Sequence, residues 1–195
     1  MIDNPYKTII KRNLPRLFAQ YLNESGNPYF GCGDRRYWAW KLIDFPNGTF
    51  QGAALGLARL YDGNFFYPDQ KPLILKRIDA MIRVLPKMMD KHGALSEALP
   101  NEASFCVTGL VLGDVAGALA MLQNEISCKQ NSKWREVCAD LADFLMKQDE
   151  YHGIISNHLA TSALGMVRWG LLAKEEKPLE RADLWIKRIK EHSCA

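Results

Sequence analysis

Three stretches rich in small residues recur about every 55 positions along this chain of 195 residues. They read FQGAALGLARL at 50–60, FCVTGLVLGDVAGALAML at 105–122 and LATSALGMVRWGLL at 159–172. Helices built from Gly, Ala, Ser and Leu can be approached closely on several sides, whereas the charged amphipathic segments between them need one face in water. A fixed period of this kind is typical of repeated helix pairs. The sequence therefore predicts small-residue helices inside and charged helices outside.

The apolar spacing in the intervening segments gives the number of helices. Apolar residues recur every three or four positions at 5–23, at 71–91, after a cap at Ser132, and at 178–192. No hairpin signal lies between two alternating strands, so we expect an all-α fold with about seven long helices in one domain, 1–195. A ring of six helix pairs needs about twelve helices. We therefore expect an array of antiparallel helix pairs forming a partial α/α toroid; the alternative is an irregular helical bundle.

Composition argues against several classes of protein. The net charge is +3, and its Lys and Arg residues are spread along helix faces, so no nucleic-acid partner is indicated. Charges interrupt the apolar stretches near the N-terminus, and no run reaches about 20 apolar residues, so we expect neither a signal peptide nor a membrane span. Five cysteines without CxxC spacing favour a reducing compartment, and we expect a cytoplasmic protein.

The sequence predicts neither a metal site nor a cofactor. His152 and His158 are six positions apart, which does not match the three- or four-residue spacing of a helical metal pair. The GCG string at 31–33 lacks the preceding strand and following helix start of a dinucleotide-binding loop.

Polar residues gather in the loops that enter the three small-residue helices. In helix-pair rings such loops line one mouth of the ring, where amides, carboxylates and hydroxyl groups suit a sugar or another small polar ligand. Flat aromatic rings near the first and third loops can pack against the apolar face of a sugar. The candidates are Asp44, Asn47 and Gln51; Glu97, Asn101 and Glu102; Tyr151, Asn157 and His158; and the platforms Trp38 and Trp40.

Helix capping is the competing interpretation for several of these residues. Asn47 and Asn101 are of the type that helix starts select, and Glu102 near a helix start complements the helix dipole. The tryptophans equally suit a core beneath a long loop. His158 retains a functional interpretation, because histidine takes up and releases protons near neutral pH. With the carboxylates of the second loop it would support hydrolysis, epimerisation or β-elimination.

Three long phrases together resemble a known family. RRYWAWKLIDFPNGTFQGAALGLARLY, ALPNEASFCVTGLVLGDVAGAL and YHGIISNHLATSALGMVRW are similar to the N-terminal helical domain of heparinase II/III-like lyases and to related toroid proteins of sugar and capsule pathways. The resemblance implies a carbohydrate-active or carbohydrate-binding domain, in its sharpest form a lyase-like fragment acting on an acidic glycan. It implies that Asn157 and His158 neutralise a uronate carboxylate while Tyr151 transfers the proton. The chain departs from the family in being short of a full ring and lacking a β-sandwich.

A non-catalytic alternative stays open at this point. A helical scaffold would bind a protein or peptide partner along its concave face and would need no acid–base group. Both interpretations leave the last helix with one side uncovered, including Leu184, Trp185 and Ile189. We therefore expect either a homo-oligomer formed through this helix or a natural continuation of the chain.

Overall fold

The computed structural model describes residues 5–151 and 156–193. Every regular element in these residues is a helix and no strand occurs among them, so the all-α prediction is confirmed. The α-helices are α1 (Pro5–Phe18), α2 (Arg35–Trp38), α3 (Ala53–Asp62), α4 (Lys71–Arg83), α5 (Phe105–Leu122), α6 (Cys128–Lys147), α7 (Ser156–Ala173) and α8 (Glu176–His192). Two short 3-10 helices cover Gly48–Gly52 and Leu85–Lys87.

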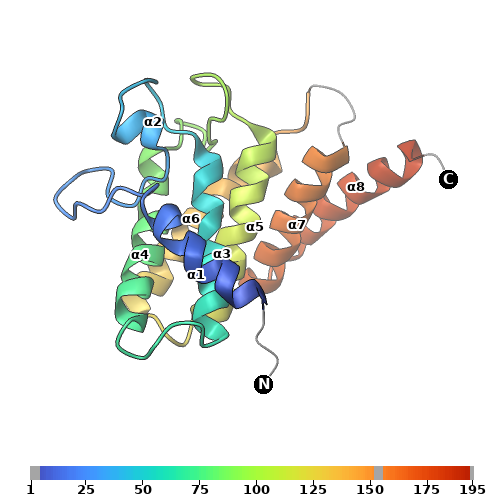
Figure 1. The fold of residues 1–195 in the computed structure, drawn as a ribbon. Coiled ribbons are helices and arrows are strands. Elements are labelled where there is room, and N and C mark those ends of the chain that lie inside the picture. Colours follow the sequence, from blue (N-terminus) through green and yellow to red (C-terminus); the bar gives the residue numbers. More distant parts are fainter. Residues whose placement is uncertain (1–4, 152–155, 194–195) are drawn as a thin grey trace.

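The small-residue helices α3, α5 and α7 lie side by side, with α5 in contact with both of the others (Figure 1). The charged helices pack on them: α4 contacts α3, α6 contacts α5 and α7, and α8 contacts α7. The outer helices also touch one another, α4 with α6 and α6 with α8. The three small-residue helices are therefore neighbours, and the charged helices α4, α6 and α8 pack against them.

Helix α5 is the centre of the core. Twelve of its 18 residues are buried, among them Val111, Leu112, Val115 and Leu119. By length and composition alone this helix would suffice to cross a membrane, yet 67% of it is buried inside the protein. Contact with helices on three sides accounts for its apolar composition.

Glycines bring α5 and α7 together. A Cβ atom added to Gly165 would lie 2.5 Å from the carbonyl oxygen of Gly109, and one added to Gly109 would lie 2.2 Å from Ser162 Oγ. The Gly113 and Gly165 backbones also meet, because a Cβ atom on Gly113 would lie 3.4 Å from Gly165 Cα. Larger side chains at these positions would force the two helices apart.

Some predicted helix boundaries were wrong. Ser132 lies inside α6; the cap is Ser127, whose side chain accepts from the backbone N–H of Gln130 in a capping box. Helix α1 ends at Phe18 rather than at residue 23, and α4 ends at Arg83. The short 3-10 turn that follows α4 contains Pro86, a residue that cannot continue the hydrogen bonding of an α-helix.

The last helix is better covered than the sequence predicted. Trp185 is fully buried, its ring standing edge-on to Phe105 with 5.2 Å between centroids, and the Arg181 guanidinium lies over it. Leu184 is exposed and Ile189 is half-buried. The expectation that Trp185 needs a partner outside this chain is therefore wrong, because Phe105 at the start of α5 packs against it.

Two glycine substitutions test the helix contact. Gly165→Ala should lower the free energy of unfolding by about 1–3 kcal/mol, because the new methyl group overlaps the Gly109 backbone. Gly56→Ala is the matched control: Gly56 is an exposed residue inside α3 with open space around its Cα, so alanine should stabilise by about 0.5–1 kcal/mol. Urea unfolding measures both, and equal stabilisation by both would contradict the close approach.

Candidate functional site

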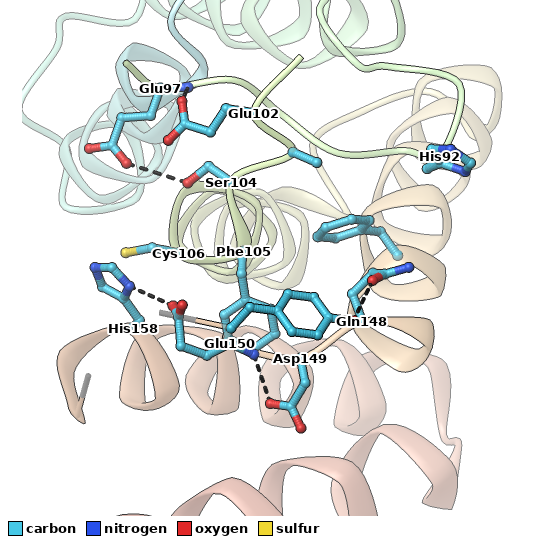
Figure 2. Close-up of a pocket in the computed structure, with 13 residues that line it drawn as sticks. His92, Glu97, Glu102, Ser104, Phe105, Cys106, Gln148, Asp149, Glu150 and His158 are labelled. Carbon is cyan, nitrogen blue, oxygen red and sulfur yellow. Dashed lines mark hydrogen bonds and ion pairs between the residues drawn. The ribbon is translucent and has the colours of Figure 1, made fainter. Parts of the chain in front are cut away.

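A cavity of about 280 Å³ lies between the second loop, which leads into α5, and the third loop, which leads into α7 (Figure 2). Its walls come from the end of α6, the starts of α5 and α7, and the two loops. The lining residues are His92, Glu97, Glu102, Ala103, Ser104, Phe105, Cys106, Phe144, Gln148, Asp149, Glu150, Tyr151 and His158. Four of the eleven residues predicted from the sequence to form the site are among them: Glu97, Glu102, Tyr151 and His158.

His158 and Glu150 form a hydrogen-bonded pair in one wall. His158 Nδ1 lies 2.6 Å from Glu150 Oε2; the histidine side chain is 27% exposed and the glutamate side chain only 1%. If Glu150 is ionised, its carboxylate can only accept a hydrogen bond, which makes Nδ1 the donor and leaves Nε2 of a neutral ring without a proton. The second ring nitrogen points away from Glu150 (Figure 2). The pairing fixes the orientation of the imidazole ring, and an imidazole held in this way can take up or release a proton near neutral pH.

Glu102 holds the second loop in shape. Its Oε2 atom accepts the backbone N–H groups of Glu97 at 3.1 Å, Ala98 at 2.7 Å and Leu99 at 2.9 Å. Asn101 and Ala103 on either side have positive φ angles of 59° and 51°. Carboxylate bonds to three consecutive donors compensate for this unfavourable backbone conformation. The structure thus gives Glu102 a role in fixing the loop.

Glu97 is the other carboxylate of the second loop in the cavity lining. It is half-buried and accepts a hydrogen bond from Ser104 Oγ at 3.3 Å. Ser104 also caps α5, accepting the backbone N–H of Val107 at 3.2 Å. The start of α5 therefore fixes where Glu97 lies.

Asp149 connects the third loop to α8. Arg188 donates to its Oδ1 at 2.7 Å, and Arg181 lies 3.6 Å from its Oδ2. Burial opposes ionisation of this carboxyl, but the Glu150 N–H bond and the two arginine charges outweigh burial and lower its pKa. Beside it, Tyr151 is 78% exposed and donates through its hydroxyl group to Gln148 Oε1 at 2.9 Å.

The Cys106 thiol is not activated for nucleophilic attack. It is half-buried, with Sγ 3.8 Å from Thr161 Oγ1. Burial raises its pKa, and the negative charges of Glu97 and Glu150 raise it further. A reactive cysteine needs the opposite electrostatic environment.

The other predicted site residues lie outside the cavity lining. Asn157 is exposed on α7, and Asp44 and Asn101 are exposed on their loops. Asn47 acts as a helix cap, accepting the Thr49 backbone N–H at 2.8 Å, so the capping interpretation is confirmed there. His152 lies outside the described residues.

The two tryptophans and Gln51 make structural contacts in and around the first loop. Trp38 is half-buried and donates from Nε1 to the Gln20 carbonyl at 2.8 Å; Trp40 is exposed beneath the Arg35 guanidinium. Gln51 is fully buried: Oε1 accepts from the Gly33 N–H at 2.9 Å, and Nε2 donates to backbone carbonyl groups. Its side chain joins three chain segments and leaves no exposed atom for a ligand.

Among the described residues no group of three or more His, Cys, Asp or Glu side chains is arranged to hold a metal ion.

Sequence reasoning missed Glu150, the residue that orients His158; its signal was a carboxylate directly before Tyr151 in a loop already singled out. Comparison with protein-family models, with curated proteins and with solved structures finds no match to this chain.

Substitution of Glu102 tests its role in the loop. Glu102→Ala removes three bonds to a charged acceptor and should lower the free energy of unfolding by about 1–2 kcal/mol. Glu24→Ala, an exposed carboxylate on another loop, should stay within about 0.5 kcal/mol of the wild type. Thermal unfolding compares them; unchanged stability in Glu102→Ala would refute the structural role.

The His158 tautomer tests the pairing with Glu150. Nitrogen NMR of ¹⁵N-histidine protein above pH 8 should show His158 protonated at Nδ1, because the carboxylate 2.6 Å away must accept. Glu150→Met keeps the side-chain size without an acceptor and should remove this preference. His158→Gln assigns the signal, and an Nε2-protonated ring in the wild type would contradict the geometry.

Proposed function

We propose that the cavity binds a carbohydrate and that His158, oriented by Glu150, acts there as an acid or base. The observation that carries the proposal is the 2.6 Å pair between a partly exposed histidine and a buried carboxylate in the wall of a cavity. A histidine that only stabilises the fold has no need of a free Nε2 atom turned away from the carboxylate that Nδ1 contacts. A histidine used for proton transfer does need such an atom.

The remainder of the lining suits a sugar. Glu97 and Gln148 supply oxygen and nitrogen atoms that hydrogen-bond with hydroxyl groups, while Phe105 and Phe144 supply apolar surface. Small-molecule sites commonly measure about 300–1,000 Å³, and the cavity of about 280 Å³ is slightly smaller than that range. It fits one terminal sugar unit better than the middle of a long chain.

Proton transfer at His158 would serve several reactions on a sugar. Hydrolysis, epimerisation and β-elimination each need a group that takes up or delivers a proton at the reacting centre. With Nδ1 committed to Glu150, Nε2 is the atom that would do so. Glu97 in the second loop would be the second carboxylate of the site.

The lyase-like reaction on an acidic glycan has weaker support. That reaction would use Asn157 beside His158 to neutralise a uronate, yet the Asn157 side chain is exposed and is not part of the cavity lining. The residue bonded to His158 is instead an acid, Glu150. A carboxylate in that place favours proton transfer over uronate binding.

We also propose that the two layers of helices are part of an α/α toroid. The successive contacts of α3, α5 and α7, with outer helices packed on them, support this arrangement. So does the position of the loops before α5 and α7, which share one cavity at the same end of the layer (Figure 1).

A scaffold that binds a protein or peptide is the second candidate function. It is favoured by a row of exposed apolar residues along α7, namely Ala160, Leu164 and Leu171. Spacings of four and seven residues place them on one face of the helix. Such a row would bind a partner without using the cavity.

Calorimetric titration of the protein with cellotetraose, xylotetraose, N-acetylated chitotetraose and oligogalacturonate tests the carbohydrate proposal. Chitosan tetraose, which carries free amines, completes the set. We expect at least one of these five glycans to bind, and reducing-end or ultraviolet assays then detect its turnover. His158→Gln should lower turnover by about 100-fold or more, because an acid–base group is lost. Asn157→Ala, an exposed neighbour outside the cavity lining, should stay within twofold.

Absence of binding for all of these glycans, the free-amine chitosan tetraose included, would refute the carbohydrate proposal. If Leu164→Asp and Leu171→Asp then abolished binding of a peptide partner while His158→Gln did not, the scaffold would replace it. Binding with turnover that His158→Gln leaves unchanged would retain the sugar site but remove histidine from its chemistry.

A further inference from the structure

The charges around the cavity are unevenly distributed. Among the described residues, four acidic side chains line it, Glu97, Glu102, Asp149 and Glu150, whereas no Lys or Arg does. Arg181 and Arg188 on α8 compensate Asp149 from behind the third loop. The second loop has no such compensation at Glu97, which belongs to none of the ion pairs among the described residues.

Helix dipoles do not reverse this charge. The N-termini of α5 and α7 lie at the cavity and favour anions, but a helix end carries only about half an elementary charge. At α5, Ser104 already accepts the Val107 N–H and donates to Glu97, so this end of the helix is occupied by the chain itself. A full carboxylate charge on Glu97 outweighs what remains.

The apolar part of the lining also suits a cation. Phe105 and Phe144 are buried and line the cavity between the loops, and Tyr151 lies at its edge, largely exposed. Aromatic faces attract ammonium groups, by about 0.5–2 kcal/mol depending on exposure. Figure 2 shows Glu97 with Ser104 on one side and Glu150 with His158 on the other, with Cys106 between them.

We infer that the ligand of this cavity is a sugar that carries a protonated amine, held by the Glu97 carboxylate. The inference rests on the proposed carbohydrate function and narrows its substrate class to amino sugars with a free amine. The cavity with its aromatic and histidine walls is the site; the uncompensated Glu97 charge selects among sugars. An N-acetylated sugar lacks the charge, and a uronate would be repelled.

Two glycans that differ only at the amine test the inference. Chitosan tetraose has free amines, and its N-acetylated form has none. Calorimetry at pH 6, where the amines are protonated, should show at least tenfold tighter binding of chitosan tetraose. Glu97→Gln keeps the side-chain shape and should abolish the difference, whereas Asp44→Asn, an exposed carboxylate outside the lining, should preserve it. Circular dichroism verifies that both variants are folded.

The possible outcomes separate the two proposals. Equal or tighter binding of the N-acetylated tetraose or of oligogalacturonate would overturn the amine inference and leave the carbohydrate site standing. If no sugar binds, cadaverine provides the second probe, since it carries the charge without the sugar. Cadaverine binding lost in Glu97→Gln would support the cation site against the carbohydrate function, and absence of cadaverine binding would overturn both.

Discussion

The close packing of α5 against α7 is the contact on which the rest of the structure depends. Gly109 and Gly165 let the two backbones meet where any side chain would collide. Because both helices begin at the same end, this contact also sets the distance between Glu97 before α5 and His158 on α7. Burial of the core and construction of the cavity are therefore consequences of the same missing Cβ atoms.

The fold was largely predictable from the sequence because small residues and charged residues alternate in long blocks. Such blocks specify which helices are buried, and the order along the chain then specifies which are neighbours. Boundaries were less predictable, since they depend on single hydrogen bonds. Ser127 and Ser132 are both plausible caps, and only Gln130, three residues after Ser127, distinguishes them.

The site was predictable at the level of loops but not of side chains. Polar residues in the second and third loops do line one cavity, yet their roles depend on which backbone groups lie within reach. Glu102 accepts hydrogen bonds from three N–H groups of its own loop, and Gln51 is buried in the core, where it accepts a hydrogen bond from the Gly33 N–H group. Neither contact has a sequence pattern, because each joins residues through tertiary or loop geometry.

Two arginines of α8 contact Asp149, so the structure that supports the cavity includes a helix outside the loops. Arg188 lies 39 residues from its partner in the sequence, on a helix that contributes no residue to the cavity lining. The loop that carries Glu150 is thus held by α8 through Asp149. Substitution of Arg181 or Arg188, on a helix outside the cavity, would therefore alter the loop that places Glu150 against His158.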